Sequence, residues 1–195
     1  MHLDDALAAL PPVPFFFLRH GETDWNRDRL AQGQTDTVLN STGRDQAAEA
    51  TPLLEDHGLT RIITSPLKRA YETAEIVNRS LNLPMTRQSG LIERAFGQHE
   101  GRPWFPGFVD AELETMEPVS DFTVRIIVAL TEVLDRYPGL LLIVSHGGVY
   151  RSFAQVLCGL ANARAANSVP FRFDPPGENT SRWRITPVDP KRPME

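Results

Sequence analysis

Two histidines and two arginines combine residue types and positions that suit chemistry at a phosphoryl group. Arg19 and His20 come directly after one apolar run, His146 follows a second, and Arg69 lies shortly after a third. Arginine binds phosphate oxygens in a bidentate fashion, and a neutral imidazole is a good nucleophile near pH 7. A lone histidine at a strand end is more often structural, so this prediction rests on the agreement of the three segments.

Metal-binding patterns do not accompany these histidines. The sequence has no HExxH motif, and its acidic residues lack the spacing of a metal site. One cysteine, Cys158, excludes an intrachain disulfide framework and a cysteine-rich zinc module, and it favours a reducing, cytoplasmic location. We therefore expect catalysis without a metal or any other cofactor, in which fixed positive groups stabilise the transition state.

The apolar runs before these residues predict buried parallel strands. Residues 13–18 and 140–144 do not alternate between apolar and polar side chains, which is typical of central strands covered on both faces. Residues 61–64 form a third, shorter strand of the same kind. Because ligands bind beyond the carboxyl ends of such strands, we expect the histidines and arginines to meet at one edge. The glycines beside each histidine would let the backbone approach a ligand closely.

Helices are expected to cover the strands. Apolar residues three and four positions apart predict helices over residues 41–57, 66–80, 122–137 and 147–160. Ser65 and Pro66 are typical of a helix start, and Pro52 should kink or split the first helix. This alternation predicts an α/β fold, a three-layer α/β/α sandwich around a mostly parallel central sheet.

The length of 195 residues suits a single domain. We expect it to span residues 13–188, with flexible tails at 1–12 and 189–195, since proline is frequent at both ends. The stretch 102–119, rich in proline and acids, is the candidate lid or rim of the site. The oligomeric state is left open.

Charge and hydropathy narrow the range of partners. The net charge is −5 at pH 7, so the surface as a whole does not suit nucleic acid or an anionic membrane. No apolar run approaches the roughly 20 residues that span a bilayer, and the N-terminus is acidic where a signal peptide is basic. The expected partner is a small phosphorylated substrate in a local basic pocket.

Several motifs together carry a family resemblance. Residues 18–26 read LRHGETDWN, residues 65–70 read SPLKRA, residues 91–101 read LIERAFGQHEG, and residues 145–148 read SHGG. With these motifs, residues 13–160 resemble the histidine phosphatase superfamily, in its phosphoglycerate-mutase-like branch.

The resemblance implies a role for each motif residue. His20 would be the nucleophile that forms a phosphohistidine, and Glu93 would protonate the leaving oxygen and then activate water. Arg19, Arg69 and His146 would hold the phosphoryl oxygens. The residues implied in substrate binding are Asn26, Thr23, Gln32, Gly33 and Gly147, and Glu22 is expected to orient the loop that follows His20.

The resemblance also implies an activity. We expect a metal-independent phosphomonoester hydrolase that acts on a phosphorylated metabolite through a phosphohistidine. A cofactor-dependent phosphoglycerate mutase is the alternative, but such mutases carry a longer, basic stretch where residues 101–120 are short and acidic. A non-catalytic phosphate-binding or scaffold protein is less expected, because the nucleophile, the acid and the three residues that would hold the phosphoryl group are all present. They are His20, Glu93, Arg19, Arg69 and His146. Which phosphomonoester is the substrate stays open.

Overall fold

The computed structural model describes residues 2–105, 113–178 and 180–191. Within these residues, six strands form one sheet in the order β3-β2-β4-β1-β5-β6. They are β1 (Phe15–Arg19), β2 (Leu59–Thr64), β3 (Met85–Arg87), β4 (Leu140–Ser145), β5 (Pro170–Asp174) and β6 (Arg184–Pro187). Strands β3, β2, β4 and β1 pair in parallel, and β5 and β6 are added by antiparallel pairing. The predicted α/β fold with a mostly parallel sheet is confirmed.

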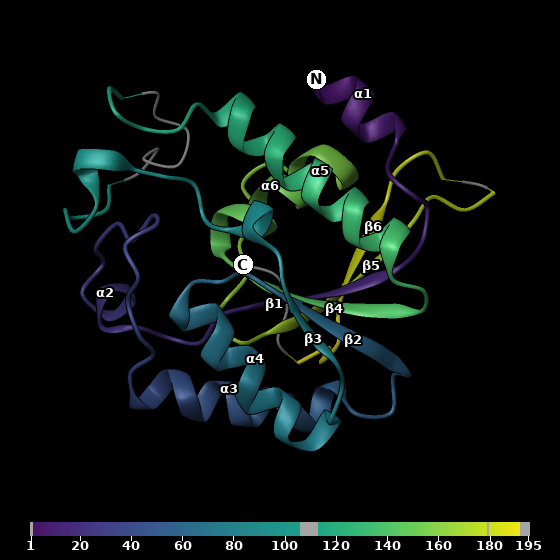
Figure 1. The fold of residues 1–195 in the computed structure, drawn as a ribbon, viewed down its shortest axis with the longest axis horizontal. Helices are drawn as coiled ribbons and strands as arrows, with labels where there is room; N and C mark the ends of the chain where they lie inside the picture. The colour runs from purple at the N-terminus through teal and green to yellow at the C-terminus, as the bar shows by residue number, and fades with distance from the viewer. Residues whose placement is uncertain (1, 106–112, 179, 192–195) are drawn as a thin grey trace.

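Helices pack on both faces of the sheet (Figure 1). One face carries α1 (Leu3–Ala8), α5 (Val119–Arg136) and α6 (Gly147–Cys158), and the other carries α3 (Ser41–Leu54) and α4 (Lys68–Leu81). Three short turns complete the described elements, namely α2 (Asp24–Arg27), η1 (Ser89–Leu91) and η2 (Gly97–His99). The arrangement is the predicted three-layer sandwich.

The aromatic run in β1 joins the two layers of helices. Phe15 and Phe17 belong to the core beneath α5 and α6, whereas Phe16 and Leu18 belong to the core against α3 and α4. All four side chains are fully buried, and each contributes about 1.5–3 kcal/mol by leaving water. A strand buried on both faces cannot alternate with polar residues, which explains the unbroken apolar run.

Two helices differ from their predictions. Helix α4 begins at Lys68 rather than Pro66, and its first backbone N–H donates to Oδ1 of Asp36 at 2.7 Å. Ser65 is therefore not its N-cap. Helix α3 runs unbroken to Leu54 with Pro52 in its last turn, so the proline lies near the helix end and does not split it.

The prediction of a flexible tail over residues 1–12 is wrong for Leu3–Ala8. These residues form α1, which packs against α5 with Ala6 fully buried. Leu3, Leu7 and Leu10 lie against the same core, so an apolar stripe with helical spacing holds this segment down.

Other predicted boundaries fall partly outside the described chain. Residues 106–112 of the candidate lid and residues 192–195 of the predicted C-terminal tail are not among the described residues. All six strands lie within the predicted domain of residues 13–188. In the part of the chain that the structure describes, no helix has the length and apolar composition to cross a membrane.

Candidate active site

The ends of three parallel strands lie in register at one edge of the sheet. Arg19 of β1 pairs with Ser145 of β4, and Thr64 of β2 pairs with Val144 of β4. The residues that follow each strand therefore come together, and the rings of His20 and His146 have their centroids 5.3 Å apart. The prediction that separate strands bring the two histidines to one edge is confirmed.

The ring of His20 is prepared as a nucleophile. Its Nδ1 lies 2.7 Å from the carbonyl oxygen of Gly21, which can only accept a hydrogen bond, so Nδ1 carries the proton and Nε2 keeps a lone pair. Burial, together with the charges of Arg69 and Arg19, holds the pKa of His20 well below its ordinary value. The imidazole is thus neutral near pH 7, as an attack on phosphorus requires.

Arg69 lies in the first turn of α4 and is almost completely buried. Its guanidinium donates to the carbonyl oxygens of Gly33 at 2.6 Å and Thr35 at 2.8 Å. Burial lowers the pKa of Arg69 to about 10, although nearby carboxylates oppose the shift, so the group keeps its charge at pH 7. Its Nε has no partner among the described residues and can still donate to an anion.

Gly33 acts on this site through its backbone. Its carbonyl holds Arg69, and its φ of +53° lies in the left-handed region. A Cβ at this position would also overlap the carboxylate of Glu100. That carboxylate accepts hydrogen bonds from the backbone N–H groups of Gln34 and Thr35, at 2.9 and 2.8 Å. Glu100 thus shapes the loop that grips Arg69, and Gly33 is better described as a positioning residue than as a substrate contact.

Arg19 connects the site to the chain before β5. Its guanidinium donates to the carbonyl oxygen of Ala165 at 2.8 Å. Nearby, the side-chain amide of Asn167 donates to the carbonyl oxygen of His20 at 2.8 Å. This segment was not assigned a role from the sequence, yet it supports both residues of the Arg19-His20 pair.

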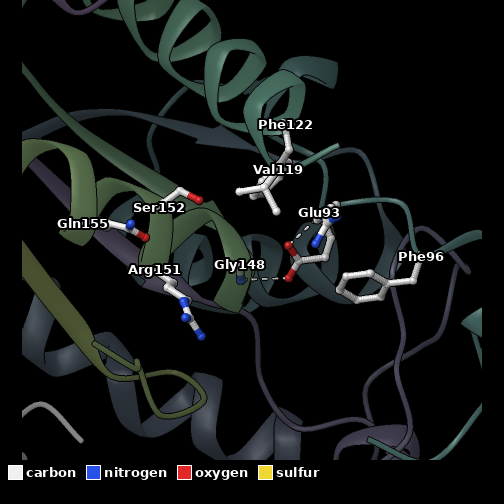
Figure 2. Close-up of a pocket in the computed structure, with 9 residues that line it drawn as sticks. Glu93, Phe96, Val119, Phe122, Gly148, Arg151, Ser152 and Gln155 are labelled. Atoms are coloured by element: carbon white, nitrogen blue, oxygen red, sulfur yellow. Dashed lines mark hydrogen bonds between the residues drawn. The ribbon is translucent and has the colours of Figure 1, made fainter. Parts of the chain in front are cut away.

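Glu93 lies opposite the start of α6, and Figure 2 shows its carboxylate turned toward that helix. One oxygen accepts from the backbone N–H of Gly148 at 2.9 Å, and the other accepts from the N–H of Arg94 at 3.0 Å. A Cβ on Gly148 would overlap the carboxylate, so a side chain at this position would displace the acid. At Gly147, the preceding position, a Cβ would lie 3.4 Å from Nε of Arg19, which is an ordinary contact distance.

A second arginine holds the segment that carries Glu93. Arg125 of α5 donates to both carboxylate oxygens of Glu117, each at 2.8 Å. It also donates to the carbonyl oxygens of Gly90 at 2.8 Å and Ile92 at 3.1 Å. It also lies 3.4 Å from the carbonyl oxygen of Glu93 itself, so Arg125 holds the backbone on which the acid is carried.

Comparison with known proteins identifies a family for this chain. The family profile described as "Histidine phosphatase superfamily (branch 1)" matches residues 15–175. The chain belongs to the histidine phosphatase superfamily. This membership confirms the predicted family and the enzyme class, a phosphatase.

Relatives of this histidine phosphatase carry two kinds of name. An uncharacterized phosphatase PhoE from Bacillus subtilis is 36% identical over 179 residues, which cover 86% of this chain and 90% of the relative. A probable phosphoglycerate mutase GpmB from Cronobacter sakazakii is 33% identical over 160 residues, or 74% of each chain. The solved structure of Bacillus stearothermophilus YhfR is similar with a TM-score of 0.77 at 26% identity. The match covers 90% of this chain and 96% of the YhfR chain.

Three polar residues of the phosphatase form a hydrogen-bonded network around α2. Oδ1 of Asn26 accepts from the backbone N–H of Thr23 at 3.1 Å, and Oε1 of Gln32 accepts from the hydroxyls of Thr23 at 3.0 Å and Thr37 at 2.6 Å. With both side-chain oxygens held in this way, the amide nitrogens of Asn26 and Gln32 have no partner among the described residues and can donate to a ligand. Thr23 is fully buried and caps α2, so it orients the two amides rather than contacting the substrate itself.

One glycine beside the nucleophile of this histidine phosphatase has a packing role. Gly21, beside His20, packs so tightly against Gly43 that a Cβ on either residue would overlap backbone atoms of the facing segment. Gly21 therefore allows α3 to approach the loop after β1. Glu22 behaves as expected, since its side chain accepts a hydrogen bond from Asn40 at 2.9 Å and so ties the loop to α3.

A pocket opens beside Glu93 between the starts of α5 and α6 (Figure 2). Its cavity volume is about 30 Å³, and it is open to solvent on one side. One wall is apolar, with Phe96, Val119 and Phe122, and the α6 wall carries Arg151 and Gln155. Among the described residues of the phosphatase, no three His, Cys, Asp or Glu side chains come together in a way that could hold a metal ion.

Several residues of this phosphatase site were missed in the sequence. Ser65 and Glu100 lie inside motifs that carried the family resemblance, so a signal for them was present. Arg125 and Asn167 had no such signal, because each acts on a segment more than 30 residues away in the chain.

Proposed function

We propose that the protein hydrolyses phosphomonoesters in two steps, through a phosphohistidine on His20. In the first step Nε2 attacks phosphorus, the bond from phosphorus to the ester oxygen breaks, and Glu93 gives its proton to the departing alcohol. In the second step water attacks phosphorus, the bond from phosphorus to Nε2 of His20 breaks and returns its electron pair to the nitrogen, and inorganic phosphate is released while Glu93 takes up the proton that water loses. The observation that carries this proposal is the contact from Nδ1 of His20 to a carbonyl, which leaves Nε2 unprotonated.

Fixed cations supply the charge that the transition state needs. Nε of Arg69 has no partner among the described residues and can donate to a phosphoryl oxygen, and Arg19 and Arg69 are close enough to His20 to lower its pKa. Such groups stabilise developing negative charge without reorganising during the reaction. This supports a reaction that proceeds without a metal cofactor.

We propose that the pocket beside Glu93 takes the leaving group of the substrate. The acid that must protonate the leaving oxygen is part of the pocket wall, so an alcohol bound there lies next to its proton donor. The apolar side suits a carbon skeleton, and Arg151 and Gln155 suit hydroxyl or anionic substituents. A small phosphorylated metabolite fits this mixture, and we propose that it is met in the cytoplasm, with neither nucleic acid nor a membrane as partner.

The mutase alternative is separated from hydrolysis by the fate of the phosphoryl group. The acidity of the segment before α5 argued against a small polyanion, but Glu117 in that segment is paired with Arg125 and does not repel a ligand. The similarity to a probable phosphoglycerate mutase keeps this activity in the test. A mutase would transfer label from 2,3-bisphosphoglycerate to 3-phosphoglycerate, whereas a hydrolase would release labelled inorganic phosphate.

The covalent intermediate provides the direct test of the proposal. Rapid quenching with ³²P-labelled nitrophenyl phosphate should trap label that is lost in acid and stable in base. His20→Asn should abolish this label, and His57→Asn, which changes an exposed histidine remote from the sheet edge, should leave it unchanged. Label that persists in His20→Asn, or that is found on His146, would overturn the assignment of the nucleophile.

A further inference from the structure

Ser65 lies at the end of β2, where it contacts the second histidine of the site. Its Oγ is 2.8 Å from Nε2 of His146, and both residues are fully buried. The other contact of the hydroxyl is a longer one, from the backbone N–H of Leu67 at 3.4 Å. Since α4 begins beyond Ser65, the short contact to His146 is the main interaction of this side chain.

The second nitrogen of His146 has no partner. Nδ1 is buried, and no described residue forms a hydrogen bond with it. Because Nε2 already faces Ser65, His146 can reach a phosphoryl oxygen only through Nδ1. An unpartnered buried polar atom beside the nucleophile indicates that a ligand completes its hydrogen bonding.

The protonation state of His146 makes its tautomer important. Burial lowers the pKa of His146 well below its ordinary value, and the neighbouring groups Arg69, His20, Arg19 and Arg125 lower it further. The ring is therefore neutral near pH 7 and has one N–H and one lone pair. A phosphoryl oxygen is an acceptor, so a lone pair on Nδ1 would repel it, whereas an N–H on Nδ1 would bind it.

We propose that Ser65 is a positioning residue, which donates its hydroxyl proton to Nε2 of His146 and thereby selects the tautomer that carries its proton on Nδ1. The inference rests on the proposed phosphoryl site. The N–H of Leu67 points at a lone pair of the same hydroxyl, which leaves the hydroxyl proton for the histidine. Both histidines then carry the proton on Nδ1, but for different reasons, since a carbonyl accepts from His20 and a hydroxyl donates to His146.

Nitrogen NMR tests the tautomer directly. In protein labelled with ¹⁵N-histidine at pH 7.5, proton–nitrogen correlations distinguish a protonated ring nitrogen from one with a lone pair. The wild type should show Nδ1 of His146 protonated and Nε2 as the acceptor, with the signals assigned by their loss in His146→Asn. In Ser65→Ala these shifts should move toward the opposite tautomer. A wild-type ring protonated on Nε2 would overturn the inference, whether or not Ser65→Ala folds.

Ligand binding provides a second, independent measurement. Ser65→Ala should weaken inhibition by inorganic phosphate and lower kcat/KM by roughly 10–100-fold, the worth of one hydrogen bond to a charged acceptor. Thr64→Val is the matched control, because it removes the neighbouring buried hydroxyl, which contacts a carbonyl rather than His146. Ser65→Thr keeps the donor and should restore most of the loss.

The two proposals fail in different ways. Wild-type enzyme that forms no phosphohistidine on His20 would refute the proposed function. Enzyme that forms it normally, but loses no phosphate affinity in Ser65→Ala compared with Thr64→Val, would refute the role of Ser65 alone.

Discussion

The guanidinium of Arg125, the carboxylate of Glu117 and the carbonyls of Gly90 and Ile92 form a clamp that holds the segment before Glu93. Arg125→Met should remove this clamp, while methionine keeps much of the length of the side chain. The guanidinium makes four hydrogen bonds of 2.8–3.1 Å, two to the carboxylate of Glu117 and two to backbone carbonyls of Gly90 and Ile92. Methionine can make none of them. Among the described residues, the carboxylate of Glu117 would keep its bond from the N–H of Ala95 at 3.1 Å.

The expected size of the effect follows from the burial of the ion pair. The side chains of Arg125 and Glu117 are 25% and 18% exposed, between the buried and the surface cases. Breaking a buried pair costs about 3–5 kcal/mol, and an exposed pair contributes about 0.2–1 kcal/mol, so we expect the free energy of unfolding to fall by about 2 kcal/mol. A misplacement of Glu93 by about 1 Å should cost roughly 10–100-fold in turnover when its proton is needed.

Two substrates separate the loss of Glu93 from a general loss of structure. A sugar phosphate releases a poor leaving group that needs a proton, whereas nitrophenyl phosphate releases a stable anion. Arg125→Met should therefore lower kcat/KM strongly for the sugar phosphate and less than about fivefold for nitrophenyl phosphate. Glu93→Gln should show the same selectivity with a larger loss of roughly 10²–10⁴ on the sugar phosphate.

The matched control is Arg136→Met, which makes the same change at an exposed position at the other end of α5. It should leave both substrates unaffected. Equal losses of Arg125→Met on both substrates would show that the clamp supports the fold rather than the acid. No loss on the sugar phosphate would refute the argument that Arg125 positions Glu93.

Three further predictions concern the position of Glu93, activity without a metal, and the charge of the two histidines. Gly148→Ala should reduce turnover of a sugar phosphate by roughly 10²-fold, because its Cβ would overlap the carboxylate of Glu93. Gly147→Ala should reduce turnover less, and a larger loss in Gly147→Ala than in Gly148→Ala would contradict this geometry. Activity should survive EDTA and be inhibited by vanadate, and a loss on chelation that Mg²⁺ or Zn²⁺ restores would contradict a transition state held by arginine. His20 and His146 are neutral when folded, whereas an unfolded imidazole takes up a proton below about pH 6.5, so stability present above that pH should be lost as the pH falls. Between pH 7.5 and 5.5 the free energy of unfolding measured in urea should fall by on the order of 1 kcal/mol for each histidine, and this loss should vanish in the double asparagine variant.

The sequence by itself determined the layers of the fold and the centre of the site. The unbroken apolar runs in β1 and β4 predict strands buried on both faces, because a strand covered by helices has no solvent side for polar residues. The chemistry-bearing residues His20 and His146 follow these runs directly, so their meeting at one edge depends only on the strands being parallel. The periodicity of apolar residues, and which residues follow each strand along the chain, are sufficient to predict these layers and this meeting of histidines.

Tertiary structure decided which atom of each group is available for chemistry. Ser65 and His146 are 81 positions apart in the chain, and the N–H of Gly148 that orients Glu93 is 55 positions from it. The stripe of α1 was visible in the sequence, but the core against which it packs is formed by α5 more than 100 residues later. A hydrogen bond depends on distance and direction within a few tenths of an ångström, and only the packed helices and strands set those for residues so far apart.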